Sequence, residues 1–250
     1  MSAVRHIGAA FWQQAAEIRD EWEAHGSACG TTDQAAAERA ISRLYRSIGR
    51  NRPQFIWVRS PLEAQPLVAH LPTLDDLYHW VKEPPASGAP PLASDFAAAV
   101  GRLRGRLEEH IRPVWFDEKQ SKKDKGKEWQ HLPPEEALAR NVAFTSVIRW
   151  YVREALLAKL GDGFFRPAKR MLGEPSPVCW YGQQEAHWIA YFDVWQRLGL
   201  AKYPAEVEAE FDTWQSLALS AGWFWLGEDR CVISQKPVSP RTFADGWTVA

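Results

Sequence analysis

The stretch from Asp33 to Glu63, DQAAAERAISRLYRSIGRNRPQFIWVRSPLE, encodes a helix, a short apolar run and a second helix start in direct succession. In its first half, apolar residues recur at spacings of four, three and four, which is the period of one buried helical face. These residues are Ala37, Ile41, Leu44 and Ile48. Asp33 stands where an N-cap is expected, and Gly49 stands where a helix ends. The pattern predicts a helix from about residue 33 to residue 48.

The second half of the stretch predicts a buried strand that leads directly into another helix. Residues 53–58 are apolar and rich in β-branched and aromatic side chains, as is typical of a buried strand. Ser60 follows at the N-cap position, and Pro61 takes the first helical position. Glu63 is placed as the reciprocal partner of Ser60 in a capping box.

Most of the remaining chain has a helical period as far as about residue 221. The expected helices cover about residues 73–80, 94–111, 133–159, 180–200 and 204–221. Residues 223–226 and 230–235 then flank a three-residue loop, which predicts a β-hairpin, and Asp245 and Gly246 are placed to turn a final short strand near Trp247. We therefore predict an α+β fold that is mainly α, with a helical core, a short buried strand after the second helix and a C-terminal β-hairpin.

Length and composition are those of a globular chain with a large core. The chain has 250 residues, of which 46% are hydrophobic and 24% are charged, so disordered and collagen-like classes are excluded. Most of the 14 tryptophans fall on apolar stripes, which predicts a tryptophan-rich core rather than an aromatic ligand box. We predict a single mainly helical domain over residues 1–250, with an exposed charged loop at about 117–130.

Charge, hydropathy and cysteine spacing limit the possible partners and compartments. A net charge of −1 argues against a dedicated double-stranded DNA binder, because such binding depends on a basic surface. No apolar run has the roughly 20 residues that a membrane helix needs, and no signal peptide is recognisable. The three cysteines, Cys29, Cys179 and Cys231, have no metal-site or disulfide pattern. We expect a cytoplasmic protein, and we predict no metal and no cofactor.

Four arginines repeat along the helix predicted at 33–48 and at its end. Arg39, Arg43, Arg46 and Arg50 follow the spacing of the apolar stripe but lie two positions further on, which turns them away from the core. Such a line concentrates positive potential and is able to follow phosphates. The alternative is that these arginines are solvated or pair with acids elsewhere in the chain.

The junction of the strand at 53–58 with the next helix is a candidate anion site. Arg59 offers a guanidinium and Ser60 a hydroxyl beside the free N–H groups of a helix start, and these groups together suit a carboxylate or phosphate. The alternative is that Ser60 only caps its own helix and Arg59 pairs with a surface acid.

The segment from Gly182 to Trp188 collects polar groups near another helix start. Glu185 and Trp188 are three residues apart and share a helical face. Glu185 or His187 would serve as a general acid or base if burial moved its pKa toward neutrality. Gln183 and Trp188 are the candidate ligand contacts of this segment. The alternative is a glutamate favoured by the helix dipole and a half-exposed histidine.

With these residues in view, the chain resembles an uncharacterised bacterial family catalogued only as a domain of unknown function. The resemblance covers about residues 33–237. It rests on Ala37 to Tyr45, Pro53 to Trp57, Ser60-Pro61, Gly182-Gln183 with Ala186 and Trp188, Ala221-Gly222-Trp223 with Trp225, and Lys236-Pro237. Members of that family continue into a Gly-Arg-Leu-His segment, whereas this chain has Val238-Ser239-Pro240-Arg241. The resemblance implies relatives but no activity.

Three functions remain open from the sequence. The first is a binding or regulatory domain for an anionic small molecule, peptide or nucleic-acid end, with Arg46, Arg50, Arg59, Ser60, Gln183 and Trp188 as its surface. The second is an enzyme of undefined class that uses Glu185 or His187 for proton transfer. The third is a protein-interaction domain with exposed aromatic residues. The oligomeric state is left open.

Overall fold

Residues 33–63 form the predicted helix, strand and helix start. Helix α2 (Gln34–Ser47) begins after Asp33, whose carboxylate accepts the backbone N–H of Ala36 at 2.9 Å. Strand β1 (Gln54–Val58) follows, and helix α3 (Pro61–Val68) begins after Ser60, whose hydroxyl accepts the N–H of Glu63. The Glu63 carboxylate accepts the backbone N–H of Arg59 instead of that of Ser60, so the capping box is displaced by one residue.

The computed structural model describes residues 7–84, 88, 90–111, 128–173 and 175–238. The fold is mainly helical, with helices making up 65% of it, and the predicted fold class is confirmed. The other helices are α1 (Ala9–Gly26), α4 (Leu74–Lys82), α5 (Leu92–Glu109), α7 (Pro134–Ala139), α8 (Phe144–Ile148), α9 (Ala155–Leu160), α10 (Arg166–Leu172), α11 (Ala186–Arg197) and α12 (Ala205–Ser220). Short 3-10 turns lie at Glu128–His131 and Gly182–Glu185 (η3 and η6), and π-helical turns lie at Arg149–Glu154 and Gly161–Phe165 (η4 and η5).

A three-stranded mixed sheet joins two segments that lie far apart in the sequence. The predicted hairpin forms from β2 (Phe224–Leu226) and β3 (Arg230–Ser234), and β3 also pairs in parallel with β1, giving the order β1-β3-β2. In this register, Ile56 lies opposite Val232. The final strand expected near Trp247 falls outside the described residues, as do residues 117–127 of the expected charged loop; its end, residues 128–130, belongs to η3.

The single helix predicted at 133–159 is wrong, because α7 ends at Ala139. Asn141 has a φ of 61°, a left-handed conformation that asparagine tolerates better than most residues. Its N–H donates to the carbonyl of Leu138, and the N–H of Val142 donates to that of Ala137, which together form a Schellman helix ending. The expected stop at Gly161 is also wrong, since the helical path continues through η5 into α10.

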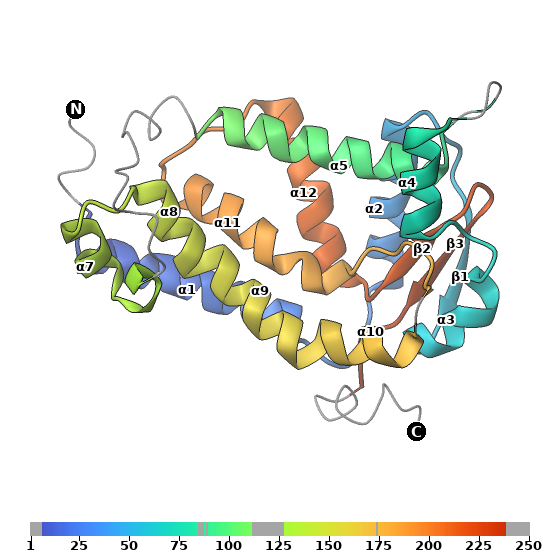
Figure 1. The fold of residues 1–250 in the computed structure, drawn as a ribbon, viewed down its shortest axis with the longest axis horizontal. Helices are drawn as coiled ribbons and strands as arrows, with labels where there is room; N and C mark the ends of the chain where they lie inside the picture. Colours follow the sequence, from blue (N-terminus) through green and yellow to red (C-terminus); the bar gives the residue numbers. More distant parts are fainter. Residues whose placement is uncertain (1–6, 85–87, 89, 112–127, 174, 239–250) are drawn as a thin grey trace.

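An aromatic core links the helices to the sheet. Figure 1 shows α11 lying between α5 on one side and the α8–α10 segment on the other. The tryptophan-rich core that the sequence predicts is confirmed, and its buried tryptophans are Trp12, Trp22, Trp180, Trp188, Trp195, Trp214, Trp223 and Trp225. Within the described ranges, no helix combines the length and apolarity that crossing a membrane requires.

Candidate functional site

The arginine line along α2 stays largely exposed. Among the described residues, Arg39, Arg43 and Arg46 form no ion pair, whereas Arg50 lies 3.0 Å from the carboxylate of Asp95 and 3.8 Å from that of Glu228. Pairing with acids elsewhere in the chain therefore accounts for one of the four arginines. The other three arginines form an exposed basic surface on α2.

The structure does not bring Arg50 and Arg59 together. They flank the two ends of β1, and five strand residues span about 16 Å. Ser60 is buried and caps its own helix, while the exposed Arg59 guanidinium pairs with Glu63, with its Nε 2.7 Å from the carboxylate. The groups that would bind an anion at this junction are therefore used by α3 itself: Ser60 caps the helix, and Arg59 pairs with Glu63.

Gln183 holds the backbone of α1 against η6. Its fully buried side chain donates to the carbonyl oxygens of Gly26 and Ala28, both at 3.0 Å. The neighbouring Gln184 accepts the indole N–H of Trp223. The Gln183 side chain therefore joins η6 to the end of α1, and the Gln184 side chain joins η6 to Trp223, which precedes β2.

Glu185 and Trp188 meet as their three-residue spacing predicts, and Arg104 from α5 joins them. The indole N–H of Trp188 donates to Glu185 Oε2 at 2.6 Å, and Arg104 Nη2 lies 3.4 Å from the same oxygen. The Arg104 guanidinium carbon also lies 4.5 Å from the centroid of the Trp188 ring, which is cation–π geometry. Burial lowers the pKa of Arg104, because desolvation disfavours a charged guanidinium, and the nearby Glu185 carboxylate opposes this shift.

Three arginines from two elements line one pocket beside this group, which we call the arginine pocket. It has a volume of about 450 Å³. Its lining residues are Arg104, Gly105 and Glu108 from α5, Arg149 and Arg153 from η4, and Trp188, Tyr191 and Phe192 from α11. The aromatic side chains are buried and form its floor, whereas Arg149 is exposed.

The π-helical turn η4 presents two of these arginines to the pocket. Turns of this kind are rare and occur often at functional sites. The Arg149 guanidinium carbon lies 5.7 Å from the centroid of the Tyr191 ring, and Arg153 Nη1 lies 2.5 Å from the carboxylate of Glu154. Sequence reasoning missed Arg104, Arg149 and Arg153. The four-residue spacing of Arg149 and Arg153 was visible, but their approach to α5 depends on the fold.

His187 lies next to the arginine pocket without lining it. Its Nδ1 is 3.1 Å from the carbonyl oxygen of Gln184. Burial lowers the pKa of His187 below its usual 6.5, while Glu185 and the contact with Gln184 oppose the shift, and the positive charges of Arg153 and Arg104 add to it. The imidazole is therefore neutral at pH 7.

This lowered pKa predicts a loss of stability in mild acid. Above pH 6.5, His187 is neutral in both the folded and the unfolded chain, so it costs nothing. As the pH falls below 6.5, the unfolded chain takes up the proton first, at a cost of up to about 1.4 kcal/mol per pH unit until the folded state is also protonated. Between about pH 7.5 and about pH 5.5, the free energy of unfolding measured with denaturant should fall more for the wild type than for His187→Gln, by up to about 1.4 kcal/mol. Equal drops in the two proteins would contradict this assignment.

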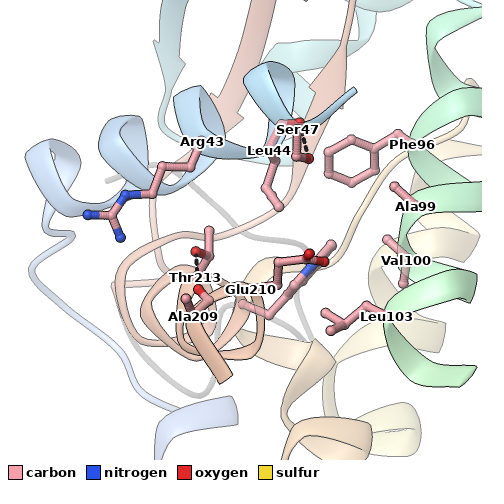
Figure 2. Close-up of a pocket in the computed structure, with 11 residues that line it drawn as sticks. Arg43, Leu44, Ser47, Phe96, Ala99, Val100, Leu103, Ala209, Glu210 and Thr213 are labelled. Atoms are coloured by element: carbon pink, nitrogen blue, oxygen red, sulfur yellow. Dashed lines mark hydrogen bonds between the residues drawn. The ribbon is translucent and has the colours of Figure 1, made fainter. Parts of the chain in front are cut away.

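A second pocket lies between α2, α5 and α12 and is mostly apolar. Figure 2 shows Leu44, Phe96, Val100 and Leu103 around it, while the Arg43 guanidinium points away from the α5 residues. Its volume is about 150 Å³, and the Glu210 carboxylate in its lining pairs with Arg106. This pocket therefore offers space for a small apolar group, and Arg43 is the one unpaired charge that the described residues place in its lining.

Two further observations bear on the candidate sites. In the part of the chain that the structure describes, no group of three or more His, Cys, Asp or Glu residues is arranged to hold a metal ion. No family model, curated protein or solved structure matches the chain. The family resemblance therefore stays a prediction.

Proposed function

We propose that this protein is a binding domain for a small anionic ligand, which it holds in the arginine pocket. The observation that carries the proposal is the convergence of Arg104, Arg149 and Arg153 on one pocket. Guanidinium groups match carboxylate and phosphate oxygens with paired donors, and charge-assisted hydrogen bonds of this kind are stronger than neutral ones. Of the surface expected from the sequence, Trp188 belongs to this site.

The floor of the pocket is held in place before any ligand arrives. Trp188 is 1% exposed, and its indole N–H is bonded to Glu185. Arg104 is in turn fixed over the Trp188 ring by its cation–π contact and by Glu185. A preorganised site loses little conformational entropy on binding, and this favours a specific ligand over nonspecific ion pairing.

The size of the pocket favours a small molecule over a polymer end. A volume of about 450 Å³ lies within the range of about 300–1,000 Å³ that is common for small-molecule sites. The enzyme alternative has less support, because neither Glu185 nor His187 lines the pocket and the Glu185 carboxylate is already engaged by Trp188 and Arg104.

Calorimetric titration with pyrophosphate at constant ionic strength tests the proposal. Replacing Arg149 or Arg153 with glutamine should weaken binding about tenfold, since each loses one charge-assisted contact worth about 1.4 kcal/mol. Arg46→Gln is the matched control, because Arg46 is exposed on α2 outside the pocket and should bind as the wild type does. The proposal fails if pyrophosphate does not bind at millimolar concentration, or if all three variants bind equally.

A further inference from the structure

Glu108 places a carboxylate in the lining of the arginine pocket. It lies one helical turn after Arg104 on α5 and is half-buried. Among the described residues, the Glu108 carboxylate forms no ion pair, and neither does the Arg149 guanidinium. The pocket therefore presents one negative and one positive group, each of which lacks a counter-ion in the described part of the chain.

These two groups stand on different walls of the pocket. Glu108 comes from α5 and Arg149 from η4, and Figure 1 shows α11 between α5 and the segment that contains η4. Tyr191 on α11 lines the pocket with both, and its ring centroid lies 5.7 Å from the Arg149 guanidinium carbon. Glu108 and Arg149 thus line the same pocket without being paired to each other.

The charges of a complementary ligand follow from this arrangement. A ligand that is only anionic gains from the three guanidiniums, but it brings negative charge close to the Glu108 carboxylate. Unlike charges facing each other across an interface favour the correct partner, and like charges reject the wrong one. A ligand with a cationic group beside its anionic group converts the repulsion at Glu108 into an ion pair.

We propose that the ligand is a small zwitterionic molecule. Its carboxylate or phosphate binds Arg149 and Arg153, and its ammonium group binds Glu108. This inference rests on the proposed function, because it requires that the arginine pocket binds an anion. It narrows the ligand class to amino acids and aminoalkyl phosphates. Both classes carry an ammonium group, and they differ in whether the anionic group is a carboxylate or a phosphate.

Matched pairs of probes that differ in the ammonium group test this inference. Titration calorimetry compares O-phosphoethanolamine with ethyl phosphate, and γ-aminobutyrate with butyrate, so that the two pairs also separate phosphate from carboxylate ligands. For the preferred anion, the ammonium group should tighten binding to the wild type about tenfold. In Glu108→Gln, the two members of the pair should bind equally.

Glu109→Gln is the control variant, because Glu109 is the next residue on α5, is exposed and does not line the arginine pocket. It should retain the wild-type preference for the ammonium-bearing probe. Thermal unfolding of each variant establishes that it is folded.

The outcomes separate the two proposals. The proposal of a zwitterionic ligand is overturned if the wild type binds both members of each pair equally. It is also overturned if the preference for the ammonium-bearing probe persists in Glu108→Gln. The proposed function still stands in that case if Arg149→Gln weakens binding of ethyl phosphate or butyrate. If no probe of either pair binds the wild type, the zwitterionic ligand is overturned, and if pyrophosphate does not bind either, the proposed function fails as well.

Discussion

Gly182→Ala is expected to destabilise the folded protein by about 4 kcal/mol, more than most single substitutions do. Gly182 has a φ of 52°, in the left-handed region that favours glycine. A Cβ atom at this position would also overlap the carbonyl oxygen of Gly222 and lie 2.6 Å from that of Ala221. Both obstacles are backbone atoms, so no side-chain rotation relieves the contact. Gln183 N–H already donates to Ala221 at this point, which limits how far the backbone is able to move.

Gly199→Ala separates steric overlap from backbone strain. Gly199 has a comparable φ of 69°, but a Cβ atom there would meet nothing within 4 Å. This control should therefore cost only the strain of a left-handed alanine, about 1–2 kcal/mol. Urea unfolding of both variants measures the difference. Equal losses of stability would show that the close approach of residues 182 and 222 is not tight.

Glu185→Ala is expected to reduce the free energy of unfolding by about 3 kcal/mol. The substitution leaves the buried indole N–H of Trp188 without its acceptor and leaves Arg104 without its carboxylate. Unpaired buried donors and charges are among the few causes of large losses from single substitutions. Chemical denaturation at pH 7 measures the loss.

Glu185→Gln divides this effect into its two contributions. The amide oxygen of glutamine still accepts the indole N–H, so the bond to Trp188 is kept while the charge that attracts Arg104 is lost. We expect a loss of about 1 kcal/mol, because Arg104 is partly exposed to water and the attraction is screened. If Glu185→Ala proves as stable as Glu185→Gln, the bond to Trp188 contributes nothing, and the floor of the pocket is less firmly held than we infer.

Features that depend on neighbouring residues were predictable from the sequence. Asp33 caps α2 through an N–H only three residues away, and Thr73 and Asp76 form a reciprocal capping box at α4. The hairpin of β2 and β3 follows from its short loop and the change of period. The bond between Glu185 and Trp188 likewise joins residues three positions apart.

Features that depend on contacts between residues distant in the sequence were not predictable from it. Nothing local indicates that β3 pairs in parallel with β1, since more than 170 residues separate these strands. The break after Ala139 depends on Asn141, which takes a conformation that glycine adopts more often. The arginine pocket needs α5, η4 and α11 to meet, and sequence periods do not report how three helical segments pack together.

A crystal structure with O-phosphoethanolamine bound tests the central claim most directly. We predict electron density for the phosphate among the guanidiniums of Arg104, Arg149 and Arg153, with the ammonium group toward Glu108. Density for the probe at the pocket between α2, α5 and α12, or along the exposed arginines of α2, with the arginine pocket empty, would contradict the account.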